Sequence, residues 1–147
     1  SPRYVLLHTF SHLLIRSLAK MCGYQSASLK ERIYSTYPSG ENMAGILIYT
    51  ASSDVEGSLG GLAAQGKSEY LEKIIDDLLD EAEWCSGDPL CMTSTGINGQ
   101  GLYGLNYAAC HQCTLLPETS CTMRNLLLDR AALIGRTEDG TVGFFIL

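Results

Sequence analysis

The sequence predicts an α/β or α+β fold, with two or three helices packed on a small sheet and an irregular zinc-binding insert. Three observations support this class. Two segments show the three- and four-residue spacing of apolar side chains that is typical of helices, and short β-rich apolar runs occur elsewhere in the chain. Residues 85–120 have no hydrophobic periodicity. With 147 residues, 46% hydrophobic and 18% charged, the chain has the composition of one globular domain.

The helices are predicted as follows. Residues 4–22 form an amphipathic helix, and Gly23 stands where a left-handed C-cap belongs. Residues 68–84 form the most regular helix, with Ser68 as its N-cap, an apolar stripe through Ile74 and Leu78, and a solvated acidic face. A shorter helix is expected over residues 122–134.

The strands are predicted from short apolar runs. Residues 45–50 read as a buried strand, and residues 142–147 as a final strand. Residues 26–34 fit either a short strand or a short helix. Residues 37–42 contain the residue types of a turn, and residues 52–66 are rich in glycine and serine.

The charge argues against nucleic acid as a direct partner of this chain alone. Its net charge is −6, and its lysines and arginines form no basic stripe of the kind that binds phosphates. No apolar run approaches the roughly 20 residues that cross a bilayer, and the first segment lacks the order of a signal peptide. We therefore expect a cytoplasmic protein. The absent initiator methionine and the apolar end suggest one zinc-binding domain, residues 1–147, that forms the C-terminal part of a longer chain.

Five of the six cysteines lie between residues 85 and 121. Cys110 and Cys113 form a C-x-x-C pair, which lets two sulfurs reach one ion from a tight turn. Cys85 and Cys91 are predicted to complete the site, and Cys121 is the substitute for either of them. Cys22 stands apart and is predicted to be a small core residue.

A structural Zn²⁺ explains how an aperiodic segment becomes ordered. Ordering each backbone residue costs roughly 1–2 kcal/mol, whereas zinc in small peptide sites contributes on the order of 10–16 kcal/mol. Four thiolates also fill the tetrahedral shell, so the predicted role is not catalytic. Disulfides, free core thiols and a redox C-x-x-C are the alternatives, but the chain shows neither a signal peptide nor the strand–helix context of a redox motif.

Three segments and the cysteine cluster together resemble a known family, the MrfA-type zinc-binding domain of certain helicases and helicase-associated proteins. The segments are His8 to Ile15, Gly45 to Tyr49 and Gly57 to Leu62. The residues around the cysteines are most similar to the branch found in the helicase-associated subunit of the DISARM anti-phage system. The resemblance implies a zinc-bound four-cysteine cluster, a role in bacterial defence, a helicase subunit as partner, and contact with DNA only within that complex. The wider first cysteine pair and an insert from Met92 to Asn106 depart from the family pattern.

Other motifs carry weaker signals. His8 and His12 have the i, i+4 spacing of a metalloprotease helix, but Thr9 stands next to His8 where the catalytic glutamate belongs. A zinc-dependent hydrolase that uses His8, His12 and a cysteine is therefore the alternative function, and buried histidines bonded to backbone groups are the simpler interpretation. The glycine-rich run Gly57 to Leu62 could bind an anion, although it matches no nucleotide motif. The chain lacks the His-x-Glu of zinc deaminases.

Overall fold

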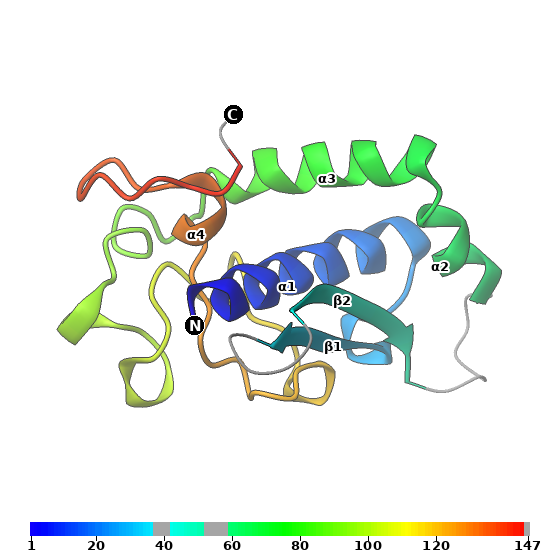
Figure 1. Cartoon of the computed structure of the whole chain (residues 1–147), viewed down its shortest axis with the longest axis horizontal. Coiled ribbons are helices and arrows are strands. Elements are labelled where there is room, and N and C mark those ends of the chain that lie inside the picture. The colour runs from blue at the N-terminus through cyan, green and yellow to red at the C-terminus, as the bar shows by residue number, and fades with distance from the viewer. Residues whose placement is uncertain (37–41, 52–58, 146–147) are drawn as a thin grey trace.

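A computed structural model describes residues 1–36, 42–51 and 59–145 of the chain (Figure 1). Its helices are α1 (Pro2–Cys22), α2 (Leu59–Gln65), α3 (Ser68–Ala82) and α4 (Ala131–Ile134), and its strands are β1 (Leu29–Thr36) and β2 (Met43–Thr50). Four single 3₁₀ turns are η1 (Ser26–Ser28), η2 (Gly96–Asn98), η3 (Leu102–Gly104) and η4 (Glu118–Ser120). The predicted class is confirmed as α+β, because the two strands form an antiparallel sheet.

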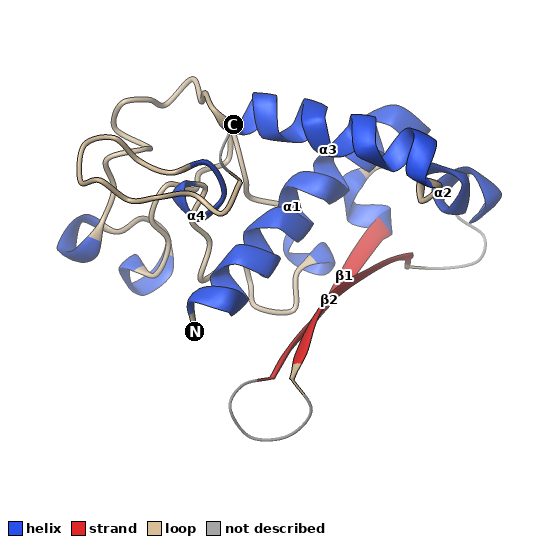
Figure 2. Cartoon of the chain, turned by 45° about the horizontal axis from the view of Figure 1, so that its top comes forward, coloured by secondary structure: helices blue, strands red, loops and turns tan. Residues whose placement is uncertain are grey.

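Helix α1 is the central element of the fold. It lies between α3 and the β-hairpin in both views (Figures 1 and 2) and also contacts α2 and α4. The predicted helix and its C-cap are confirmed, since Gly23 has a left-handed φ of 73°. Because neighbours cover most of its circumference, α1 also buries a polar set that the apolar pattern did not predict: His8, Thr9, Ser11 and His12.

The β-hairpin covers one side of α1. Its register pairs Leu29 with Thr50, and residues 26–34, left open between helix and strand, form η1 followed by β1. The strand predicted at residues 45–50 is confirmed, but its predicted burial is wrong. Leu47 and Tyr49 are exposed, because a two-stranded antiparallel sheet packed on one helix leaves its other face in water.

Helix α3 packs along α1 and supplies much of the core. The predicted helix is confirmed, and its stripe of Ile74, Leu78, Leu79 and Ala82 is buried against α1 residues such as Ile15. The predicted N-cap is displaced by one residue. Lys67 occupies that position and makes no side-chain cap, while Ser68 is the first helical residue.

The helix predicted over residues 122–134 is largely wrong, since only α4 is helical. Arg124, Asn125 and Leu127 have positive φ. The Asn125 side chain accepts a hydrogen bond from the Leu116 N–H (2.9 Å) and donates one to its carbonyl (2.8 Å). A side chain that pairs with a distant backbone in this way competes with the helical ladder.

The final strand is also absent from the described residues. Arg136 and Thr141 form one isolated bridge, after which the Phe144 and Phe145 N–H groups donate to the Ala132 and Leu133 carbonyls. These bonds attach the chain to α4 rather than to a sheet. Residues 37–41 of the predicted turn, residues 52–58 of the glycine-rich run and residues 146–147 lie outside the described residues.

Candidate metal centre

The four cysteines chosen from the sequence converge on one point. Their sulfurs all lie within 4.8 Å of one another, and none of them is in a disulfide. Sγ–Sγ separations are 3.5 Å for Cys85–Cys110, 3.8 Å for Cys91–Cys113 and 3.7 Å for Cys110–Cys113. A tetrahedral zinc with Zn–S bonds of about 2.3 Å requires sulfurs about 3.8 Å apart. The donor set and its spacing therefore fit Zn²⁺.

The first pair is carried by a loop that begins directly after α3. The Asp88 carboxylate accepts hydrogen bonds from the Cys85 N–H (2.8 Å) and the Met92 N–H (3.1 Å). The Cys91 N–H bonds to the Gly87 carbonyl at 2.9 Å. These bonds fold the five intervening residues into a compact turn, so the wide C-x5-C spacing still brings both sulfurs together.

The second pair lies on a tight turn. The Cys113 and Thr114 N–H groups donate to the Cys110 carbonyl, at 3.3 and 2.9 Å. The Cys110 N–H and the Thr114 hydroxyl both donate to the Cys113 sulfur, at 3.4 and 3.2 Å. Donors aimed at a sulfur favour its thiolate form, which is the form that binds metals.

The thiols of the cluster differ in acidity. The hydrogen bond from Cys91 lowers the pKa of Cys113 to about 4, and the nearby Arg130 charge acts in the same direction. Burial raises the pKa of Cys85 to about 11, and the bond to Cys113 together with burial raises the pKa of Cys91. Each thiolate therefore opposes ionisation of the neighbouring thiols, and a divalent cation bound between the sulfurs would offset the repulsion between their negative charges.

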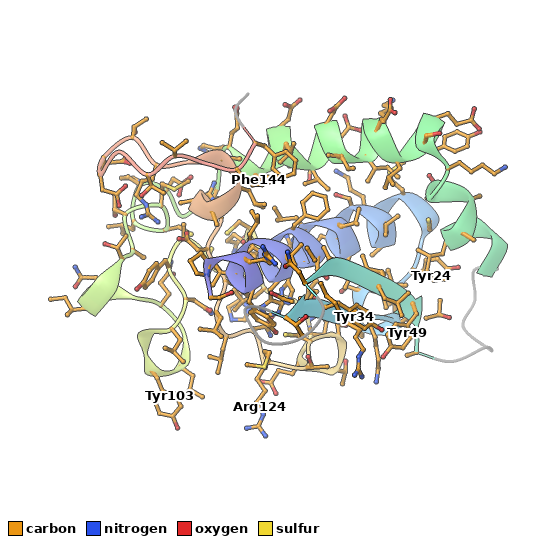
Figure 3. All side chains as sticks on the ribbon, in the orientation of Figure 1. Tyr24, Tyr34, Tyr49, Tyr103, Arg124 and Phe144 are labelled. Carbon is orange, nitrogen blue, oxygen red and sulfur yellow. The ribbon has the colours of Figure 1, made fainter. Side chains whose placement is uncertain are left out.

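The insert at residues 92–106 is tied to this cluster. It contains η2 and η3, and Gln100 and Asn106 close it by pairing their backbones. The Gln100 amide donates to the Tyr107 carbonyl at 2.9 Å and approaches the Cys91 sulfur at 3.7 Å. Gly99 is required here, because a Cβ would lie 2.0 Å from the Gly104 carbonyl oxygen. Tyr103 projects from this insert, away from the body of the molecule (Figure 3).

The remaining candidates lie elsewhere. Cys121, the predicted substitute, is outside the four-cysteine cluster, and the exposed His111 is not part of it either. Cys22 packs against the core, half-buried. In the glycine-rich run, residues 57–58 lie outside the described part of the chain, and the residues that follow begin the short helix α2.

A second group of potential ligands was only partly visible in the sequence. Cys121 lies beside the His8 and His12 pair of α1, with Glu31 of β1 completing the group, and all four ligand atoms lie within 4.8 Å of one another. The i, i+4 histidine spacing was the one available signal. Glu31 and Cys121 lie far from the two histidines in the sequence. They reach them only because β1 and the C-terminal loops pack on α1.

The charges of this second group are strongly coupled. Burial opposes the charged form of His8, but hydrogen bonds with Cys121 and Glu31 outweigh it and raise the pKa of His8 to about 9. Burial likewise opposes ionisation of Cys121, while bonds with His12 and His8 lower its pKa to about 6. The expected backbone bond is present for His12, whose Nδ1 lies 3.1 Å from the Thr114 carbonyl oxygen, but the partner is not the glycine-rich run.

Four converging thiols on a helix-and-hairpin scaffold place this chain in the class of zinc-binding domains. The chain belongs to the MrfA Zn-binding domain family, whose family model matches residues 10–114 and so includes all four cysteines. It is 46% identical over 142 residues to the DISARM protein DrmB of Bacillus paralicheniformis, an alignment that covers 97% of this chain and 24% of that protein. The chain thus spans about a quarter of the relative's length. The family resemblance deduced from the sequence is confirmed.

None of the helices in the described ranges combines the length and apolar character that a bilayer-crossing helix needs.

Proposed function

We propose that this chain is a non-catalytic zinc module of a helicase-associated anti-phage defence protein and that it docks a helicase subunit of the same system. In this proposal Cys85, Cys91, Cys110 and Cys113 hold one structural Zn²⁺. The observation that carries it is the near-tetrahedral spacing of four sulfurs at the base of a loop segment that exposes large apolar side chains. The family membership and the DISARM relative support the defence context.

The zinc would order a segment that has little core of its own. Residues 85–113 consist of turns and single 3₁₀ turns. The segment contains no α-helix and no β-strand. Few of its large apolar side chains are buried. Burial alone would not offset a backbone ordering cost of roughly 1–2 kcal/mol per residue, so the metal supplies the difference.

The same segment offers a surface for a partner. Tyr103 and Leu90 have exposed fractions of 83% and 80%, Ile97 is fully exposed, and Trp84, directly before the segment, is 70% exposed. Aromatic and large aliphatic side chains of this kind are the usual anchors of protein–protein interfaces. A zinc-ordered backbone would present them without a further ordering cost at binding.

The site chemistry supports a structural role. Four sulfur ligands complete a tetrahedral shell, so no position remains for water or substrate. The alternative hydrolase would need an open metal position at His8, His12 and Cys121, but these residues are buried, and the histidines have no exposed surface. A cytoplasmic location, where thiols stay reduced, agrees with the absence of any disulfide among the six cysteines.

The charge supports contact with DNA only through the complex. The net charge is −6, and the acidic residues Asp76, Asp77 and Asp80 of α3 are exposed. Such a face would repel phosphates and would suit water or a basic partner. Binding of duplex DNA by this chain alone at physiological salt, with micromolar affinity or better, would contradict the proposal.

The docking test compares exposed apolar residues in and outside the insert. We expect Ile97→Asp and Tyr103→Asp to weaken capture of the helicase subunit by at least about tenfold, as hot-spot losses do, with zinc content unchanged. Val142→Asp is the matched control, since Val142 is 77% exposed but lies near the C-terminal end of the described chain. If Ile97→Asp and Tyr103→Asp capture the helicase subunit as well as Val142→Asp does, docking through the insert is refuted.

A further inference from the structure

The second ligand group lies in the interior, between α1, β1 and the loop after η4. Its ligand atoms are His8 Nε2, His12 Nε2, Glu31 Oε1 and Cys121 Sγ. His8 Nε2 lies 2.9 Å from Glu31 Oε1 and 3.2 Å from Cys121 Sγ, and His12 Nε2 lies 3.4 Å from Glu31 Oε1. Tetrahedral zinc places nitrogen, oxygen and sulfur ligands about 3.3–3.6 Å apart. The observed spacing agrees to within a few tenths of an ångström.

Hydrogen bonds from outside the group orient three of the four side chains. His12 Nδ1 donates to the Thr114 carbonyl, because a carbonyl can only accept, and this leaves the lone pair on Nε2. Ser11 Oγ donates to Glu31 Oε2, which leaves Oε1 toward the centre of the group. The Asn125 N–H donates to the Cys121 sulfur at 3.3 Å. Bonds of this kind, from neighbouring groups to the ligands, are typical of metal sites. His8 is the exception, because its Nδ1 is buried without a hydrogen-bond partner among the described residues, and its ring centroid lies 5.3 Å from that of the Tyr4 ring.

Two of the inward atoms make no hydrogen bond of good geometry. His12 Nε2 and Glu31 Oε1 are buried and have only ion-pair contacts within the group, at 2.9 Å from Glu31 Oε1 to His8 Nε2 and 3.4 Å to His12 Nε2. Buried polar atoms are paired in almost all native proteins, because leaving one unpaired costs about 1–3 kcal/mol. A cation at the centre of the group would satisfy both atoms at once.

The charge of the group fits a divalent ion. With a metal bound, both imidazoles are neutral, and together with one carboxylate and one thiolate they give the ligand set a charge of −2, which one M²⁺ neutralises. Imidazole and thiolate ligands favour Zn²⁺ over Mg²⁺ or Ca²⁺, which prefer oxygen.

We infer that His8, His12, Glu31 and Cys121 bind a second zinc ion, a structural one that ties α1 to β1 and to the C-terminal loop. The site is distinct from the four-cysteine cluster, since it shares no ligand with it. His8 and Cys121 fall outside residues 10–114, the part of the chain that matches the family. The inference does not depend on the proposed docking role.

The first test counts metal in the purified protein reconstituted with excess Zn²⁺ and then freed of loosely bound ions. We expect two zinc ions per chain by elemental analysis. X-ray absorption should give between two and three sulfur neighbours per zinc on average, because five sulfurs and three nitrogen or oxygen atoms are shared by two ions. One zinc per chain with four sulfur neighbours would overturn the inference and would leave the proposed function intact.

The second test separates the two sites by mutation. Cys121→Ser and His12→Gln should each lower the zinc content from two ions to one per chain. The average number of sulfur neighbours per zinc should then rise to four. The matched controls are Cys22→Ser and His111→Gln, which remove a thiol and an imidazole outside both groups. Retention of two ions by both ligand variants would also overturn the inference. If the ligand variants do not fold, the measurements on the unmutated protein still decide the question.

Discussion

Arg130 is completely buried beside the four-cysteine cluster. Its guanidinium donates to both oxygens of Asp88, at 2.7 and 2.9 Å, and to the Ala82 carbonyl at 2.7 Å. Asp88 in turn orients the backbone of the Cys85–Cys91 loop. This one residue therefore connects the end of α3, the first cysteine pair and α4.

Replacing Arg130 with Met should destabilise the protein by about 3–5 kcal/mol, because it leaves the largely buried Asp88 without its cation. Arg130→Lys should recover part of the loss, since one ammonium cannot reproduce the paired contacts. Chemical denaturation in the presence of excess zinc measures the change. The exposed Arg124→Met is the control, and a change of less than about 1 kcal/mol for Arg130→Met would show that this ion pair is not needed.

The contacts of Asn125 explain why most of residues 122–134 do not form the predicted helix. Asn125, with a φ of 57°, bridges the Leu116 backbone, and the Asn106 side chain donates to the Asn125 carbonyl at 2.6 Å. These contacts occur between residues that are about 10 to 20 positions apart. Helical spacing in residues 122–134 could not reveal them, because it registers only neighbours on the same turn.

At the scale of elements, α1 and α3 were predictable because each has the apolar spacing of a helix, and α1 also ends at the C-cap residue Gly23. Their packing was less predictable. Helix α3 buries one apolar stripe, as amphipathic surface helices do, whereas α1 also buries the polar set His8 to His12. The polar set is accommodated because β1 and the C-terminal loops supply partners for it.

Truncation of the α3 stripe tests its part in the core. Leu78→Ala should lower the free energy of unfolding by about 2–5 kcal/mol, because Leu78 is buried and its loss leaves a cavity. Asp77→Ala, the adjacent exposed position, should change it by less than about 0.5 kcal/mol. Thermal or denaturant unfolding compares the two. Similar losses for both variants would mean that α3 is not held by its apolar face.

At the scale of the whole molecule, the hydrophobic core and the four-cysteine cluster occupy different regions. The core cluster is formed mainly by α1 and α3, while residues 85–113 surround the sulfurs. With the proposed zinc bound, each region would have its own source of stability. The fold should respond unevenly when the metal is removed.

Removal of zinc with a strong chelator should abolish hydrogen-exchange protection over residues 85–113 and retain more of it in α3. The reason is that the free energy of metal binding is the free energy that orders the loop. Acid should act in the same direction as the chelator, since protonated thiols no longer bind zinc. Mass spectrometry of exchanged peptides provides the measurement. Unchanged protection after verified metal loss would show that the loops are ordered without zinc.

Local patterns in the amino-acid sequence were enough to predict a mixed class, α/β or α+β, together with the two main helices, one strand of the hairpin and the four cysteines whose sulfurs converge. These features follow from the local periodicity of apolar residues and from the short spacing of the C-x-x-C, both of which occur between residues close together in the sequence. Packing between distant segments was needed to bring Cys121 to His8, His12 and Glu31 and to fold residues 122–130 into turns. Those outcomes depend on contacts between segments as much as 113 positions apart, as for His8 and Cys121, and on buried polar groups that must find partners wherever the packing puts them.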